Sequence, residues 1–181
     1  MGNTTHPVVD GNIQALAQLH GFISRLTGEQ YGAQTPLLTR SAIGAHCRHI
    51  LDMYEALVQA SDENGVVDYD FRRRGTDIER DQTLALANIE RLQGWLECIP
   101  SGCLDNVITV RNEVDLTQQV STLVESNIAR ELMFAASHCI HHLALMGLLA
   151  AAMGLRVEPE LGVAPATASF LRSDSELAEL G

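Results

Sequence analysis

Apolar residues recur at intervals of three and four along four separate segments of this chain, and this helical period limits its fold more than any other feature. The first such segment extends from about Asp10 to Thr27 and is followed by Gly28, a residue type that commonly follows a helix C-terminus. Its periodic positions are Ile13, Leu16, Leu19, Ile23 and Leu26. The segment therefore predicts a helix with one buried face.

Two further helices are predicted in the middle of the chain. The second begins after the N-cap residue Ser41 and continues to about Ala60 with the same apolar period. The third begins near Thr76 and ends before Pro100. Residues 61–75, between these helices, have no helical period and include several turn-forming residues, so we expect a long crossover loop there.

The fourth predicted helix is the longest. Thr122 and Glu125 match a capping box, and the apolar period continues from there to about Met153. Just before this helix, residues 107–110 and 119–121 flank a polar stretch. That pattern permits a small β-hairpin between the third and fourth helices.

Four helices, one long crossover and no internal repeat predict an all-α fold, a four-helix bundle that forms a single domain over residues 1–181. The composition agrees, because the chain is 46% hydrophobic but only 4% aromatic, which suits packed helices better than short strands. From about residue 155, Pro159 and Pro165 prevent a continuous helix. An extended C-terminal tail is therefore expected to wrap over the bundle.

The acidic charge of the chain bears on its partners. With 23 acidic and 12 basic residues, the formal net charge of −11 repels nucleic acid and anionic membranes, so neither is an expected partner. The basic cluster from Arg72 to Arg74, with the nearby Tyr69, is interpreted as a solvated surface turn. The alternative is that Tyr69, Arg72 and Arg73 contact an anionic substrate or the carboxylate of a thiol. The N-terminus lacks a secretory signal, and the longest apolar run, residues 143–155, is too short to span a bilayer. These features predict a cytoplasmic location.

Three imidazoles lie close together on the fourth predicted helix, at His138, His141 and His142. At about 100° per residue, His138 and His142 are about 40° apart on one face and about one turn apart along the axis, so both rings can reach one ion. His141 falls on another side of the helix. This spacing is typical of metal sites on helices, and its alternative is a pair of histidines that make only hydrogen bonds in the core.

A second histidine pair, His46 and His49, lies on the second predicted helix beside three alanines that leave space next to it. Facing helices of a bundle commonly build metal sites, so either of these residues can supply a third ligand. Three protein ligands leave a coordination position for water or substrate, as in catalytic sites. Three imidazoles suit zinc or nickel and also accept iron or manganese. His141, and whichever of His46 and His49 is not a ligand, are expected beside the site or at an interface, and His20 is expected to be a packing or surface residue.

The segment His49-Ile-Leu-Asp-Met-Tyr-Glu55, followed on the fourth predicted helix by His138-x-x-His141-His142, resembles the DinB-like (DinB/YfiT-like) superfamily. The resemblance covers residues 13–171. It implies a four-helix bundle with an up-up-down-down course, usually a homodimer, that holds one divalent metal ion through His49, His138 and His142. The match of the segment around His49 favours this residue over His46.

In better-known members of the superfamily, the metal activates the sulfur of a low-molecular-weight thiol for transfer to an electrophile. The resemblance therefore implies a metal-dependent thiol S-transferase, because a divalent cation stabilises thiolate over thiol, or a hydrolase that uses a metal-activated water. Residues 143–145, Leu-Ala-Leu, replace the Arg-Gly-Gln often found there, so the substrate of the known members is not carried over. The alternative function is a non-catalytic metal-binding bundle that acts through dimerisation or partner binding.

Two carboxylates are candidates for roles near the metal. Glu131 lies seven residues before His138, about 20° away around the helix, so it is a candidate acid, base or partner of a ligand in the same cavity. A salt bridge with Arg130 is the alternative for Glu131. Asp52, three residues after His49, is a candidate for orienting that imidazole.

Overall fold

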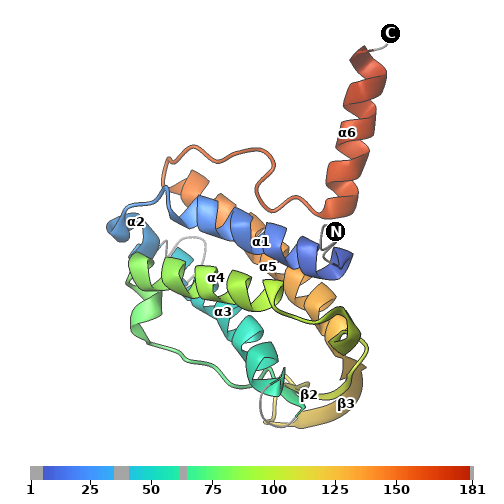
Figure 1. The fold of residues 1–181 in the computed structure, drawn as a ribbon. Helices are drawn as coiled ribbons and strands as arrows, with labels where there is room; N and C mark the ends of the chain where they lie inside the picture. Colours follow the sequence, from blue (N-terminus) through green and yellow to red (C-terminus); the bar gives the residue numbers. More distant parts are fainter. Residues whose placement is uncertain (1–5, 35–40, 62–64, 180–181) are drawn as a thin grey trace.

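A computed structural model describes residues 6–34, 41–61 and 65–179 of the chain. In these ranges, α-helices alternate with three short strands and two 3₁₀ turns (Figure 1). The helices are α1 (Pro7–Ile23), α2 (Gly28–Gly32), α3 (Ile43–Gln59), α4 (Gln82–Glu97), α5 (Ile128–Ala152) and α6 (Pro165–Glu179). The strands are β1 (Val66–Asp68), β2 (Val107–Glu113) and β3 (Ser121–Asn127), and the 3₁₀ turns are Asp77–Glu79 and Ser101–Cys103.

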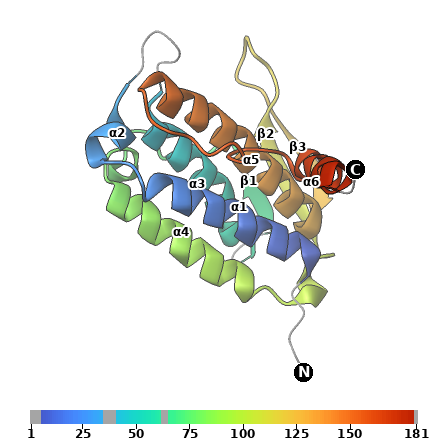
Figure 2. The same ribbon diagram turned by 90° about the horizontal axis from the view of Figure 1, so that it is seen from above.

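The four long helices α1, α3, α4 and α5 form the core of the molecule (Figure 2). Helix α5 packs against α1 and α3, and α4 packs against the same two helices from the other side. The apolar stripes that the sequence predicted are the faces that meet, since burial of apolar area is the main force that joins amphipathic helices. Fully buried side chains on them include Leu16, Leu19, Ile50, Leu57, Ile89, Leu92, Leu132 and Leu143.

The prediction of an all-α fold is wrong, because the described residues also form a three-stranded mixed sheet, which makes the fold α/β. Strands β2 and β3 are the antiparallel hairpin that the sequence permitted, with Val110 opposite Val124, but both strands are longer than expected. Strand β1 adds to β2 in parallel, with Val67 beside Val110. It arises from residues 61–75, which were interpreted as a loop, because two consecutive valines favour a strand once a partner edge is available.

The sheet also changes where α5 begins. Thr122 and Glu125, predicted as a capping box, lie within β3, where their backbone pairs with β2. The N-cap of α5 is Asn127, whose Oδ1 accepts a hydrogen bond of 2.8 Å from the backbone N–H of Arg130. Pairing of this segment with β2 thus outweighs a local capping pattern, and the chain passes from strand to helix without a loop.

Two other helix starts differ from the predictions. Helix α3 has Ala42, not Ser41, at its N-cap, and no side chain caps it. The predicted start of the third helix near Thr76 is a 3₁₀ turn, and α4 begins only after Asp81, whose Oδ1 accepts from the backbone N–H groups of Thr83 and Leu84. An aspartate that accepts hydrogen bonds from two otherwise free N–H groups is a stronger helix-start signal than the pattern near Thr76.

The C-terminal tail was expected to be extended from about residue 155. Residues 153–164 do run over the surface of α1 and α5, where the Gln18 side chain donates to Glu160 O and accepts from Gly162 N–H. Gly162 has a φ of 71° and lies against the Ala144 backbone, a place that only glycine fits. The expectation is wrong from Pro165 onwards, because α6 begins there, with proline in the first turn, and projects away from the bundle (Figure 1).

Among the described residues, α5 is the one helix long and apolar enough to cross a membrane by length and composition. Of its most apolar window, 44% is buried inside the protein. A central helix of a packed core has the same composition, and α5 also carries the half-buried polar residues His138 and His142. Its apolar character therefore follows from its place between α1 and α3.

Candidate metal centre

Helices α3 and α5 bring together the three histidines that the resemblance selected. His49 lies near the middle of α3, and His138 and His142 lie one turn apart on the face of α5 that packs against α3. All three side chains are half-buried. On each helix, apolar residues that pack into the core flank them on both sides. The packing of two helices thus places the imidazoles at one point without any help from a loop.

The Nε2 atoms of the three rings converge. The distance from His49 Nε2 to His138 Nε2 is 2.8 Å, and the distance from His138 Nε2 to His142 Nε2 is 3.0 Å. One ligand atom from each residue lies within 4.8 Å of the others. Two nitrogens bound to one metal ion at ~2.1 Å lie ~3.0 Å apart at a right angle and ~3.4 Å apart at a tetrahedral angle. The three histidines therefore lie close enough to hold a metal ion, and neutral imidazoles are suitable donors.

The chemistry of the rings also fits a cation. An Nε2 atom of a neutral imidazole carries either a proton or a lone pair, never both. His138 Nε2 contacts the Nε2 atoms of both other rings. Hydrogen bonds can account for both contacts only if two N–H groups donate to one lone pair, or if one N–H group donates to two lone pairs. A single cation instead accepts all three lone pairs at once, which makes a metal ion the better partner for this arrangement.

The electrostatic setting keeps the rings neutral. Burial lowers the pKa of His49 to about 3, with further lowering by the nearby Arg72 guanidinium, and burial lowers the pKa of His142 to about 3. Burial also lowers the pKa of His138. The lowered pKa values favour the neutral form of all three rings, and a neutral ring keeps one nitrogen lone pair available, which is the state that a metal ligand needs.

The remaining ring nitrogens have different partners. His142 Nδ1 lies 2.9 Å from Nδ1 of His46, so the histidine that the resemblance set aside contacts one of the three candidate ligands. His49 Nδ1 lies 2.5 Å from Nη1 of Arg72, a residue to which the sequence assigned no role. His141 is exposed, on the side of α5 that the helical period predicted.

Asp52 does not orient His49. Its carboxylate is 3% exposed and accepts hydrogen bonds from Arg48 Nη1 at 3.0 Å and from Arg73 Nε at 2.6 Å. Arg48 also donates to Glu79 at 2.9 Å. These pairs fasten the segment between β1 and α4 onto α3, and so they hold Arg72 beside the histidines.

Glu131 is fully buried, and its carboxylate has three donors from different parts of the chain. Tyr69 donates its hydroxyl to Oε2 at 2.9 Å, whereas Ser126 and Arg130 donate to Oε1 at 2.6 Å each. Within residues 6–34, 41–61 and 65–179, none of its hydrogen bonds reaches a histidine ring. The ion pair with Arg130 that the sequence offered as the alternative is present, and the carboxylate also links β1, β3 and α5.

Comparison of the chain with models of protein families, with curated proteins and with solved structures gave no match. The functional argument therefore depends on the geometry of this chain.

The interpretation of Tyr69, Arg72 and Arg73 as a solvated turn is wrong for two of them. Tyr69 is 8% exposed and Arg73 is held by Asp52, while Arg72 is exposed but directed at His49. A signal was present in the sequence, because Val66-Val67-Asp68-Tyr69 alternates like a strand that buries every second residue. The strand ends at Asp68, and four residues later Arg72 contacts His49 of α3.

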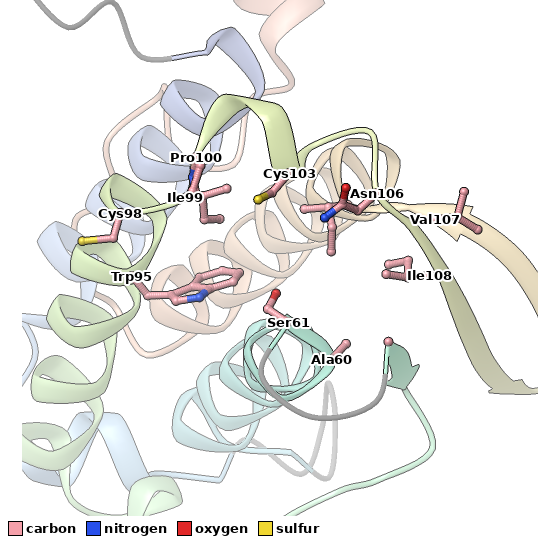
Figure 3. A pocket seen from close by; sticks show the side chains of 12 residues that line it. Ala60, Ser61, Trp95, Cys98, Ile99, Pro100, Cys103, Asn106, Val107 and Ile108 are labelled. Atoms are coloured by element: carbon pink, nitrogen blue, oxygen red, sulfur yellow. The ribbon is translucent and has the colours of Figure 1, made fainter.

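A separate cavity of about 350 Å³ lies at the C-terminal ends of α3 and α4 (Figure 3). Trp95 and Ile99 form one side of it, and Ala60 and Ile108 lie on the other. Ala60 is eleven residues beyond His49 on the same helix, which corresponds to about 16 Å along the axis. This cavity is therefore distinct from the histidine site and contributes no residue to it.

Proposed function

We propose that this protein is a divalent-metal-dependent enzyme of the DinB-like type that joins a low-molecular-weight thiol through its sulfur to an electrophile, with loss of the thiol proton and of the electrophile's leaving group. The observation that carries the proposal is the convergence of three Nε2 atoms, from His49, His138 and His142, on one point between α3 and α5. Zinc or nickel suits three imidazoles best, and iron or manganese is also compatible with them. Three protein ligands leave the ion able to accept a substrate atom.

When bound, a divalent cation at this point would favour a thiolate over a thiol at neutral pH. The protein's own contribution is to hold the ligands neutral and pre-positioned. Burial lowers the pKa of His49 and His142, and the rigid packing of α3 on α5 keeps the rings together without the entropy cost of ordering a loop. The side of the site that faces solvent is bordered by Tyr69, Phe71 and Arg72, from the segment after β1.

Glu131 enters this proposal as a positioning residue. Its three hydrogen bonds hold Tyr69 beside His49 and fix the first turn of α5, two turns before His138. A buried carboxylate with three donors is already fully engaged, so a direct exchange of protons with a substrate would require these bonds to break.

The test is a thiol-transfer assay on protein loaded with zinc or with nickel, with glutathione as the thiol and a chlorinated nitrobenzene as the electrophile. We expect turnover that depends on the metal, that is lost in His138→Ala, and that is kept in His20→Ala. His20 is a matched control, because it is a helical histidine whose Nε2 contacts Glu90 at the surface. Equal rates in the wild type and His138→Ala would contradict the enzymatic proposal.

One observation favours a second function, in which the ion only locks α3 against α5 and the protein acts by dimerisation or partner binding. The cleft beside His49 leaves no space that a water molecule could enter, and the Arg72 side chain, which borders it, lies against the His49 ring. For this structural function we expect a large rise in Tm on metal loading but no metal-dependent turnover with any thiol tested. For either function we propose a homodimer as the oligomeric state, to be measured by light scattering.

A further inference from the structure

Arg72 is set apart from its neighbours by what it contacts. The adjacent Arg73 is paired with Asp52, and Arg48 on α3 is paired with Asp52 and Glu79. Within the part of the chain that the structure describes, Arg72 forms no ion pair with a carboxylate. Its Nη1 instead lies 2.5 Å from Nδ1 and 3.4 Å from Nε2 of His49. An unpaired guanidinium is thus held against a ring that the proposed function makes a metal ligand.

This contact is incompatible with a metal-bound His49. When Nε2 gives its lone pair to a cation, the proton of the neutral ring must be on Nδ1. A guanidinium N–H this close to the ring then has no lone pair to donate to, because Nδ1 carries the proton and Nε2 binds the ion, and arginine has no acceptor atom. The ion also brings like charge next to Arg72, whose Nη1 lies 3.4 Å from Nε2, so metal binding must displace Arg72 from His49. The displaced side chain remains within reach of the site, because Arg73 and Asp52 hold the backbone next to it in place.

The charges indicate what Arg72 binds after this displacement. Three neutral imidazoles leave the two positive charges of a divalent ion uncompensated, and Arg72 adds a third beside them. The two carboxylates that act on Arg72 do not cancel this charge, since Asp52 is already engaged with two arginines and Asp70 with Arg111. An anion between the ion and the guanidinium compensates the positive charge of both groups at once. A planar carboxylate is the anion whose shape matches the paired N–H groups of arginine.

From these contacts we infer, on the basis of the proposed function, that Arg72 anchors a carboxylate of the substrate at the solvent-facing side of the three-histidine site. The cleft there is bordered by His49, Asp52, Met53, Tyr69, Phe71 and Arg72. It is small while Arg72 rests on His49 and widens when Arg72 moves away. The substrate class is therefore a small molecule with a carboxylate close to its reacting atom.

The probe is acetate, with acetamide as its uncharged counterpart, and the protein is the full chain loaded with cobalt(II). Binding of acetate changes the visible absorption of cobalt, so its dissociation constant can be measured without any turnover. The variants are Arg72→Gln and the matched control Arg74→Gln, which removes an exposed arginine two residues further along. Metal affinity is measured in parallel by competition with a chelator.

We expect Arg72→Gln to weaken acetate binding at least tenfold and to leave acetamide binding unchanged. The same variant should bind the metal several times more tightly, because it removes a positive charge and its amide oxygen can accept from His49 Nδ1–H. Arg74→Gln should match the wild type in both measurements. Equal acetate affinity in the wild type and Arg72→Gln overturns the inference alone. Failure of the wild type to bind cobalt overturns the proposed function, and the role of Arg72 with it.

Discussion

His46 Nδ1 lies 2.9 Å from His142 Nδ1, on the edge of the His142 ring opposite to the Nε2 that faces the other two histidines. If His142 binds a cation through Nε2, its proton is on Nδ1 and is donated to His46. Metal-binding histidines usually have such an acceptor, which fixes the tautomer and the ring orientation. In the proposed metal site the two histidines of α3 would therefore have different roles, with His49 as a ligand and His46 as the hydrogen-bond acceptor of the ligand His142.

Replacement of His46 by Ala is expected to weaken metal affinity by roughly 10–100-fold without abolishing it, because the ligands remain but His142 loses its acceptor. His46→Asn should recover part of the loss, since its side-chain oxygen can accept from Nδ1–H. Chelator competition measures both variants, with His141→Ala as a control on the exposed side of α5. A variant that loses all metal would instead make His46 a ligand.

The stability of the metal-free protein should fall in acid. The pKa of His142 is about 3 in the folded state against 6.5 in the reference state, so below pH 6.5 the unfolded chain binds a proton that the folded chain does not. Stability is therefore lost as the pH falls from about 6.5 towards 3. After allowance for solvent screening, we expect His142 to contribute about 1–2 kcal/mol to the loss between pH 7 and pH 4.5.

The check on this pH dependence is urea denaturation of the metal-free wild type and His142→Ala at both pH values. Between pH 7 and pH 4.5, His142→Ala should lose less stability than the wild type does, whatever its stability at pH 7. Identical losses would mean that His142 titrates normally in the folded protein.

Tyr69→Phe should destabilise the protein by about 1–3 kcal/mol, because Glu131 would remain fully buried with one donor fewer. Chemical denaturation of the metal-free protein measures this cost directly. Ser126→Ala removes a second donor from the same carboxylate and should have an effect in the same range. If both variants are as stable as the wild type, the hydrogen bonds from Tyr69 and Ser126 do not hold this carboxylate.

The start of α5 gives a prediction that separates two capping signals. Asn127→Ala should cost about 1 kcal/mol, because Asn127 caps the helix, whereas Thr122→Ala should cost less, because Thr122 is an exposed strand residue. Urea denaturation of the two variants decides between them. A larger effect at Thr122 would support the capping box that the sequence suggested.

The sequence predicted the parts of this fold that depend on local pattern. The stripes around Leu16 and Leu132 are buried as their period required, and the HxxxH pair faces α3 because one turn separates its members. The mixed sheet was beyond such reasoning, because Val67 becomes a strand residue only through its pairing with Val110, 43 positions away. Long-range pairing is set by tertiary structure, which a window of neighbouring residues does not contain.

The candidate site likewise has features that the sequence predicted and features that only the tertiary structure determines. The convergence of His49 with His138 and His142 was anticipated from the resemblance, whereas the contacts of Arg72 and His46 depend on how the crossover and α3 lie against the rings. Asp52 was expected to contact His49 because only three residues separate them. Its carboxylate instead accepts a hydrogen bond from Arg73, 21 residues later in the chain. Charged partners in a buried position are chosen by geometry, and the sequence alone offers several equivalent choices.

The measurement that tests the central claim most directly is the metal content of natively purified, tag-free protein, determined by plasma mass spectrometry beside His49→Ala, His142→Ala and the control His20→Ala. The three-histidine site predicts close to one equivalent of a divalent metal in the wild type and in His20→Ala, and little in the two ligand variants. No metal in the wild type after loading, or equal content in all four proteins, would contradict it.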